Sequence, residues 1–378
     1  MPFNTTEVAK QIEQSRRGVQ AEARARQDAI ALALKIYREA DETAWEQRVQ
    51  DASARRWVGE PLSPLHEQSS ARISAPDYSV VATDSSFIAP DKHRGAMSYL
   101  INVGRVMVSY GDQPAAEIDN TPNHYSDLLV EGEEAMSGRV LQAKCALREL
   151  HELYAWADLY RPDLALLDGS LMQLVLVLSK EEHVEALMAD YFRTLRAFHD
   201  IRVPIIGYIS LPESQMVMRA IRMLACDKPV PCEKQPDPDD PCGCRPLWTI
   251  NDADLFWEML DANQRSPIFG PEFSHLVGSN APDIKQMVFA YLGTQYETAR
   301  LEFPAWVWEE GLLERAISIT LHQSLLGRGY PNCLTLAHQF AALHNVDRES
   351  YYFLLERAGL LTKTSEKAHG KRMIGQAI

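Results

Sequence analysis

The sequence predicts an α/β protein in which a mixed β-sheet is flanked by helices. Short apolar runs that end at turn residues are typical of buried strands, and they occur at 78–83, 164–167 and 203–209. Longer segments with apolar residues at helical spacing separate these runs, at 131–159 and 179–199. Strands that alternate with helices in this way imply a sheet with helices packed on its faces.

The N-terminal part of the chain is predicted to be a helical extension over residues 1–60. Asn4 and Glu7 form a pair suited to capping a helix, and apolar residues recur at helical spacing through the first 57 residues. We expect a long helix or a helical hairpin that packs on the main body, or alternatively an arm for partner docking or dimerisation. The proline-containing segment 59–76 is typical of a linker into the first strand.

Further elements follow from the same patterns. An apolar, β-branched strand is predicted at 98–110, with Gly104 as the site of a bulge. The segment 361–378 is basic and poor in apolar residues, so we expect a flexible tail there. The remaining expected elements are strands at 287–292 and 299–303 and helices at 255–260, 309–326, 334–343 and 348–358.

Length and composition fit a globular protein with a large core. The 378 residues are 46% hydrophobic and 24% charged. No apolar run approaches the roughly 20 residues that span a bilayer, and the N-terminus lacks a signal-peptide pattern, so we expect a cytoplasmic protein that does not bind membranes. The net charge of −14 argues against a surface that coats nucleic acid non-specifically, but it is compatible with a nuclease that has a local basic channel.

Two aspartates come directly after apolar strands. Asp84 follows the run at 78–83, and Asp168 follows the run at 164–167. Each precedes Ser or Gly, which is also common in ordinary turns, but their joint occurrence favours two acids presented at strand ends. The helix between them carries Glu149 and Glu152, one turn apart. Carboxylates that meet in this way can share a divalent metal, which activates water and neutralises phosphate charge.

Several motifs occur together along the chain. They are Thr83-Asp84-Ser85-Ser86, Leu167-Asp168-Gly169-Ser170-Leu171, the segment 297–307, and Gly329-Tyr330-Pro331 with Ala337-His338. In order and spacing they resemble the NurA family of DNA-repair nucleases over residues 78–358. The resemblance implies a nuclease domain at 77–360 with a core of ribonuclease H and Argonaute type, and manganese-dependent cleavage at DNA ends. It also implies a homodimer that works beside a hexameric HerA-type ATPase.

The resemblance assigns the active site residue by residue. Asp84 matches the first acidic position and Asp168 the second, while the acid from the helix is Glu149 or, alternatively, Glu152. These side chains would hold Mn²⁺ or Mg²⁺, because both ions prefer oxygen ligands. Ser85 stands where the family commonly has glycine, so the closer backbone approach that glycine permits is not assured in this chain.

Tyr330 and His338 match the C-terminal pair of the family's active site. His338 would either ligate the metal, since manganese also accepts imidazole, or transfer a proton. Tyr330 would orient the scissile phosphate or stack on a base. Arg105 and Arg300 are further candidates for contacts with DNA phosphates, although Arg300 and Glu302 share one strand face and could instead form a salt bridge at the edge of the core.

Four cysteines are concentrated in a polar insertion at 226–246. Cys226, Cys232, Cys242 and Cys244 lack the paired C-x2-C spacing of a zinc ribbon, yet four thiols this close together favour a metal site. A structural Zn²⁺ or an iron–sulfur cluster would fix a loop too polar to bury itself. Unliganded thiols are the alternative.

The sequence thus predicts a manganese-dependent deoxyribonuclease. It would process single-stranded and double-stranded DNA ends in double-strand-break repair, as an exonuclease with single-strand endonuclease activity as a further option. One rival is a non-catalytic NurA-like partner that binds the ATPase and DNA. A second rival is a hydrolase of small phosphorylated molecules that uses the same metal site.

Overall fold

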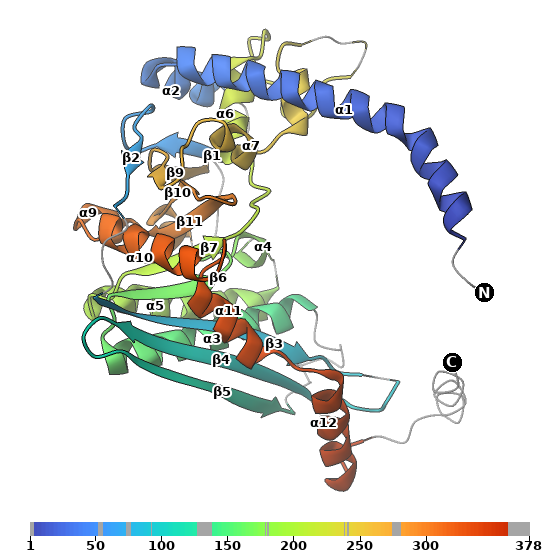
Figure 1. Ribbon diagram of the computed structural model, residues 1–378, viewed down its shortest axis with the longest axis vertical. Coiled ribbons are helices and arrows are strands. Elements are labelled where there is room, and N and C mark those ends of the chain that lie inside the picture. The colour runs from blue at the N-terminus through green and yellow to red at the C-terminus, as the bar shows by residue number, and fades with distance from the viewer. Residues whose placement is uncertain are drawn as a thin grey trace. The chain divides into compact units, whose positions relative to one another are not determined.

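The computed structural model describes residues 4–51, 56–72, 77–91, 93–126, 138–177, 179, 181–237, 239, 242–273 and 281–361 (Figure 1). The predicted basic tail lies outside these ranges apart from its first residue. Contacts within the chain define two compact units. Unit 1 comprises Met1–Ala71 and Ile209–Leu301, and unit 2 comprises Arg72–Tyr208 and Glu302–Ile378.

The sheet of unit 2 combines antiparallel and parallel strands. β3 (Tyr78–Ile88), β4 (Tyr99–Tyr110) and β5 (Ala115–Tyr125) are antiparallel neighbours. β6 (Leu164–Asp168) lies parallel to β3, and β7 (Ile205–Ile209) lies parallel to β6. The resulting order, β7-β6-β3-β4-β5, is that of a ribonuclease H-like core. The predicted fold class, a mixed sheet flanked by helices, is therefore confirmed.

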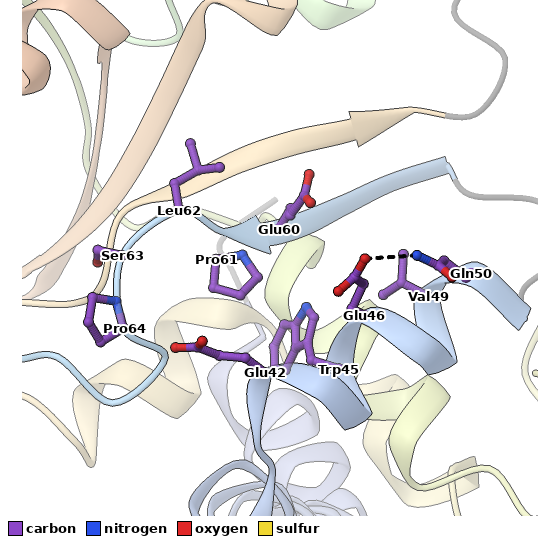
Figure 2. Close-up of a pocket in the computed structure, with 10 residues that line it drawn as sticks. All are labelled: Glu42, Trp45, Glu46, Val49, Gln50, Glu60, Pro61, Leu62, Ser63 and Pro64. Carbon is purple, nitrogen blue, oxygen red and sulfur yellow. Dashed lines mark hydrogen bonds between the residues drawn. The ribbon is translucent and has the colours of Figure 1, made fainter.

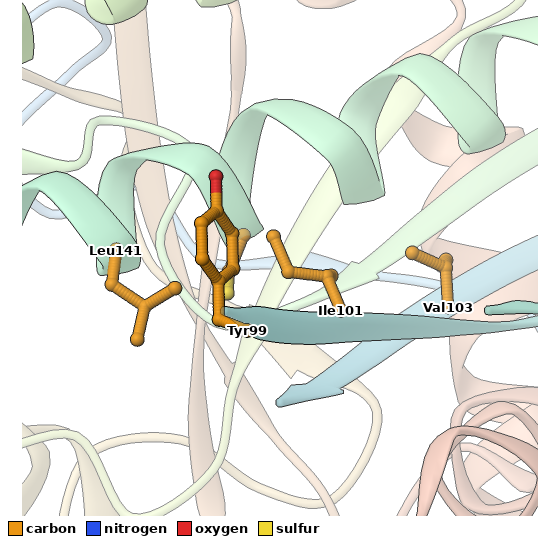
Figure 3. Close-up of a cluster of buried hydrophobic side chains, with 5 residues drawn as sticks. Tyr99, Ile101, Val103 and Leu141 are labelled. Atoms are coloured by element: carbon orange, nitrogen blue, oxygen red, sulfur yellow. The ribbon is translucent and has the colours of Figure 1, made fainter. Parts of the chain in front are cut away.

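Helices pack on both faces of this sheet. Tyr99, Ile101 and Val103 of β4 point toward α3 (Gly138–Tyr160), where they meet Leu141 in an apolar cluster (Figure 3). Asn102 points the opposite way because side chains alternate along a strand, and it donates a hydrogen bond to the Ala341 carbonyl. The other helices of unit 2 are α4 (Leu174–Val177), α5 (Glu182–Asp200), α9 (Ala305–Glu309), α10 (Leu313–Leu326), α11 (Asn332–Ala341) and α12 (Asn345–Arg357).

Gly104 allows α11 to lie directly on the sheet. A Cβ atom at this position would be 2.2 Å from the carbonyl oxygen of Ala337 and 2.5 Å from the nitrogen of Ala341. β4 keeps a continuous register with both neighbouring strands through Gly104, so the predicted bulge is absent. The glycine is needed for the close approach of a helix, and this helix carries His338.

A buried polar network fixes the start of α11. Gln323 of α10 donates hydrogen bonds to the hydroxyls of Tyr78 and Tyr110, at 2.8 and 3.1 Å. The amide oxygen of the same side chain accepts the N–H of Cys333 at 3.0 Å. Because Gln323 is fully buried, each of these bonds satisfies a group that would be costly to leave without a partner.

Unit 1 contains the N-terminal helices. The Asn4 side chain accepts the N–H of Glu7, as predicted, and α1 (Thr5–Glu39) is followed by α2 (Glu42–Asp51). The helix expected through residue 57 ends at Asp51. Arg56–Pro61 instead forms strand β1, which pairs with β9 (Phe269–Phe273) where a linker was expected.

None of the helices in the described part of the chain has the length and apolar character that a membrane crossing requires.

The strand order in unit 1 is β1-β9-β10-β11, with β8 paired to β10 and β2. The remaining elements of unit 1 are β2 (Ser69–Ser70), α6 (Met216–Leu224), η1 (Arg245–Thr249), α7 (Asp252–Trp257), β8 (Gln264–Arg265), α8 (Ala281–Lys285), β10 (Met287–Gly293) and β11 (Thr298–Pro304).

The tight approach at Gly104 leads to a first prediction. Gly104→Ala should lower the free energy of unfolding by about 1–3 kcal/mol or more, the usual cost of overpacking, because the backbone of α11 has to move away. Urea denaturation measures this change. Gly18→Ala in α1 is the matched control, since no atom lies within 4 Å of its added Cβ. Equal stability of the Gly104→Ala variant and the native protein would contradict the close packing.

Candidate active site

Asp84 and Asp168 lie where β6 ends beside β3. The parallel pairing stops at Thr83↔Leu167, one residue before each aspartate. Asp168 is the last residue of β6, as predicted, and Gly169 then turns the chain with a φ of +95°, a conformation that favours glycine. β3 continues to Ile88, however, so Asp84 lies within its strand rather than at its end.

Asp84 is held by two hydrogen bonds. Its Oδ1 accepts the N–H of Ser85 at 2.7 Å, and its Oδ2 lies 2.6 Å from Nδ1 of His338. The Asp84 side chain is 14% exposed, whereas the His338 side chain is 70% exposed. The pair therefore places an exposed imidazole at the rim of the site and a nearly buried carboxylate beneath it.

Glu149 of α3 is the most buried acid of the group. One oxygen, Oε2, accepts a hydrogen bond from the Ser85 hydroxyl at 2.8 Å, while the buried Oε1 has no partner among the described residues. Burial raises the pKa of Glu149 well above its ordinary value. The charges of Asp84 and Asp168 raise it further, and the Ser85 hydrogen bond lowers it. A neighbouring cation would satisfy the unpartnered oxygen and favour the ionised form.

Glu152, the alternative helix acid, is already engaged. Its two oxygens bind Arg105 at 2.9 Å and Arg148 at 2.5 Å. Arg105 also binds Asp119 and lies over the ring of Trp156, 4.9 Å from its centroid. The structure thus brings Glu149, not Glu152, to the two aspartates, and it places Arg105 within an ion-pair network.

Asp168 faces Tyr330. Asp168 is exposed as a residue, but partial desolvation of its carboxyl group raises its pKa. The Tyr330 hydroxyl and His338 lower this pKa, and the charge of Asp84 raises it. The Tyr330 hydroxyl is buried and close to this carboxyl but outside hydrogen-bonding geometry. The Tyr330 ring packs edge-on against Tyr208, with centroids 5.4 Å apart. Burial raises the pKa of Tyr330, as do Asp168 and Asp84, so this hydroxyl keeps its proton and can act as a hydrogen-bond donor.

A cavity of about 190 Å³ lies beside the acids, lined by Ser85, Glu149 and Asp168 together with residues of α3 and the segment after β6. This volume accommodates several water molecules, each of about 30 Å³ in the liquid. Carboxylate oxygens with one orphaned buried atom fit a hard divalent cation. Among the described residues, however, only the four cysteines place three or more ligand atoms within 4.8 Å of one another. The carboxylates would have to draw together around an ion.

A larger cavity, about 500 Å³, lies in unit 1 between α2 and β1 (Figure 2). Three glutamates line it beside Trp45, and none belongs to the predicted site. Glu46 accepts a hydrogen bond from Gln50 at 2.9 Å, and Glu42 accepts the N–H of Leu65 at 3.3 Å. Both carboxyl groups are therefore engaged by the protein.

Arg300 is enclosed in unit 1. It is 2% exposed, its guanidinium lies 3.7 Å from the centroid of the Phe289 ring, and it donates a hydrogen bond to Ser214 at 3.0 Å. This guanidinium is not presented to a surface where DNA phosphates could bind.

Glu302 has a role that the sequence did not reveal. It accepts hydrogen bonds from the Ser170 hydroxyl at 2.7 Å and from the N–H of Met172 at 3.1 Å. It thereby fixes the segment that follows Asp168. Its position within the 297–307 motif is the signal that could have identified it.

The four cysteines of the insertion meet in unit 1. Their sulfur atoms all lie within 4.8 Å of one another, and all four thiols are free of disulfides. Burial raises the pKa of Cys242, but the N–H groups of Cys244 and Asp227 and the neighbouring thiols outweigh this and lower it to about 7. The predicted proximity of the four thiols is confirmed.

The strand order and the carboxylates beside it place unit 2 in the class of ribonuclease H-like nuclease folds. The NurA domain model matches residues 78–343, well over half of the chain, and the protein belongs to the NurA family. The family resemblance inferred from the motifs is thus confirmed, and family and fold together support a nuclease. Among curated proteins the comparison finds no significant match.

Three solved structures similar to this chain share low sequence identity with it and have TM-scores below 0.5. Endonuclease V from Bacillus subtilis is 12% identical with a TM-score of 0.33, over 72% of this chain and 81% of that chain. Endonuclease V from Ciona intestinalis, in complex with inosine-containing DNA, is 18% identical with a TM-score of 0.18, over 36% and 48%. RuvC from Thermus thermophilus is 11% identical with a TM-score of 0.17, over 44% and 88%.

The burial of Glu149 leads to a second prediction. Its pKa is higher in the folded than in the unfolded protein, so between the two values the folded state binds the additional proton and the free energy of unfolding falls as pH rises. Without added divalent metal, Glu149→Gln should therefore be more stable than the native protein at about pH 8, and the difference should shrink toward about pH 5.

Urea denaturation across this pH range provides the test. Glu258→Gln, at an exposed position in unit 1, controls for the loss of one carboxylate. A stability difference that stays constant with pH would show that Glu149 does not titrate as its surroundings require.

Proposed function

We propose that this protein is a metal-dependent DNA nuclease. The observation that carries the proposal is the convergence of Asp84, Glu149 and Asp168, from β3, α3 and β6. Glu149 and Asp168 line a cavity, and one buried Glu149 oxygen has no partner among the described residues. Membership of the NurA family supports the same reaction. The residues proposed from the sequence for catalysis are these three acids with Tyr330 and His338.

The acids are the proposed ligands of Mn²⁺, with Mg²⁺ as the other ion that suits oxygen ligands. A bound ion would activate water and neutralise charge on the scissile phosphate. Desolvation and the neighbouring carboxylates raise the pKa values of Glu149, which is buried, and of Asp168, which is exposed at the end of β6. Ser85 positions two of the ligands, since its N–H binds Asp84 and its hydroxyl binds Glu149.

His338 and Tyr330 act from the side of α11. His338 Nδ1 contacts Asp84, so a proton on the exposed ring can be held there and passed to the leaving oxygen, or the ring can turn to ligate the ion. Tyr330 keeps its proton and can donate a hydrogen bond to a phosphate oxygen beside Asp168. Arg105 and Arg300 do not enter this proposal, since one is engaged in ion pairs and the other is buried.

A third prediction tests the activity. Purified protein with Mn²⁺ should degrade labelled linear DNA. Asp168→Asn and Glu149→Gln should each reduce the rate by more than the roughly 100-fold that loss of an outer-shell group costs, because each removes a metal ligand. Glu152→Gln is the matched control on the same helix, and it should stay within a few-fold of the native rate.

Two outcomes would favour the rivals. DNA that stays intact at high protein concentration, with and without a HerA-type ATPase, would indicate a non-catalytic partner. Release of phosphate from nucleotides without cleavage of polymers would indicate a small-molecule phosphohydrolase. Normal activity of Asp168→Asn would show that the site has been wrongly assigned.

We further propose, from family membership, that the protein acts on DNA ends in double-strand-break repair as a homodimer beside a HerA-type hexameric ATPase. The first part of α1 offers a surface for such contacts, since Ile12 and Val19 are 65% and 60% exposed.

A fourth prediction follows from this assembly. The protein should sediment at twice its chain mass of 42.7 kDa, and it should co-elute with a HerA-type ATPase from the same genome. Replacing Ile12 and Val19 by Ser should weaken either association, because buried apolar area is lost. A monomeric protein that does not bind the ATPase would contradict the proposed assembly, but it would not contradict the proposed nuclease chemistry.

A further inference from the structure

We propose that Cys226, Cys232, Cys242 and Cys244 bind a single structural zinc ion. Three sulfur–sulfur distances are 3.7 Å between Cys226 and Cys232, 3.5 Å between Cys226 and Cys242, and 3.4 Å between Cys242 and Cys244. Ligands about 2.3 Å from zinc in tetrahedral geometry lie about 3.8 Å apart. The four thiols are therefore close to the spacing that one tetrahedral ion imposes.

The distances between the sulfur atoms also distinguish a zinc site from an iron–sulfur cluster. The thiolates of a cluster bind different iron atoms and surround inorganic sulfide, which requires a wider cage. Here all four sulfur atoms lie within 4.8 Å of one another. That space fits one ion and is too small for a cluster, which decides between the two metals that the sequence left open.

The surroundings of the sulfur atoms are those of a metal centre. The backbone N–H groups of Asp227 and Cys244 hydrogen-bond to Cys242, as outer-shell groups commonly do for metal ligands. The Asp227 carboxylate in turn accepts the N–H of Gly243 at 2.9 Å. Among the described residues, Ala225 alone joins these thiols in the local apolar cluster, so the described part of the loop gains little stability from apolar burial.

Charge supports the same assignment. Four thiolates around Zn²⁺ carry a net charge of −2, which favours nearby cations. Arg222 of α6 is 4% exposed and close enough to Cys244 for the two groups to interact electrostatically. Its guanidinium lies over the Trp248 ring, 4.4 Å from the centroid. Arg222 also interacts with the charge of Asp252 and donates hydrogen bonds to the Gln215 side chain and the Leu247 carbonyl, so four thiolates would add to this compensation.

The metal would connect the insertion to the N-terminal helices. Arg48 of α2 donates hydrogen bonds to the carbonyls of Met223, Cys226 and Lys228 at 3.1, 2.9 and 3.1 Å, and to that of Pro229 at 3.3 Å. These carbonyls have the right positions only while the chain around Cys226 keeps its turn. Zinc is thus expected to hold α2 against the insertion, in the unit that does not contain the carboxylates.

The test is the metal content of the full-length protein purified without chelators. Elemental analysis should find about one zinc per chain and no inorganic sulfide. Cys242→Ser should lower the zinc content at least about fivefold, because serine is a poor zinc ligand. Cys333→Ala is the matched control at a buried cysteine outside the cluster, and it should retain the zinc.

Three measurements on the protein without substitutions remove any dependence on folding of the variant. A mercurial thiol reagent should release one zinc per chain, and protein refolded with Co²⁺ should show the sulfur-to-cobalt charge-transfer band of a tetrahedral thiolate site. Limited proteolysis near residue 48 should accelerate once zinc is released. Native protein with no zinc, iron with stoichiometric sulfide, or unchanged zinc in Cys242→Ser would each overturn the proposal.

Discussion

The site depends on one electrostatic constraint, which is that three carboxyl groups lie close together and one of them, that of Glu149, is buried. Glu149 is 8% exposed and lies near Asp84 and Asp168. Like charges and burial both oppose ionisation, so the group at neutral pH either keeps a proton or gains a cation. A divalent ion at this position would relieve the repulsion and the desolvation together, which is why the proposed site suits such an ion. The buried Glu149 Oε1, which has no partner among the described residues, is the atom that a cation would contact.

The fold meets this constraint with contacts that are distant in sequence. α3 brings Glu149 to the sheet. Ser85 links Glu149 to Asp84, because its hydroxyl binds the first carboxylate and its N–H binds the second. On the other face α11 can approach only because Gly104 has no Cβ, and this approach carries His338 to Asp84. Packing of a helix backbone on a strand thus sets the distance between the two proposed catalytic groups, Asp84 and His338.

Local patterns predicted much of this arrangement, since a buried strand followed by an acid is visible in the chain. Asp168 lies at such a strand end, whereas β3 runs on past Asp84 because β4 continues to pair with it. Glu149 and Glu152 could not be separated, because the arginine that engages Glu152 comes from β4. Arg300 was a candidate for DNA contacts because the sequence does not show which side chains enclose it in the folded protein. β5 was missed since it is largely exposed and lacks an apolar pattern.

The two candidate metal sites differ in the chemistry of their ligands, and this difference decides how metal effects should be interpreted. Carboxylate oxygens suit manganese and magnesium, whereas four thiolates suit zinc. A chelator that removes both ions would abolish activity without identifying the site responsible. Restoring Mn²⁺ alone separates them, because the oxygen site needs only that ion while the thiol site stays empty. If activity returns but α2 stays protease-sensitive, catalysis and the sulfur site are energetically independent.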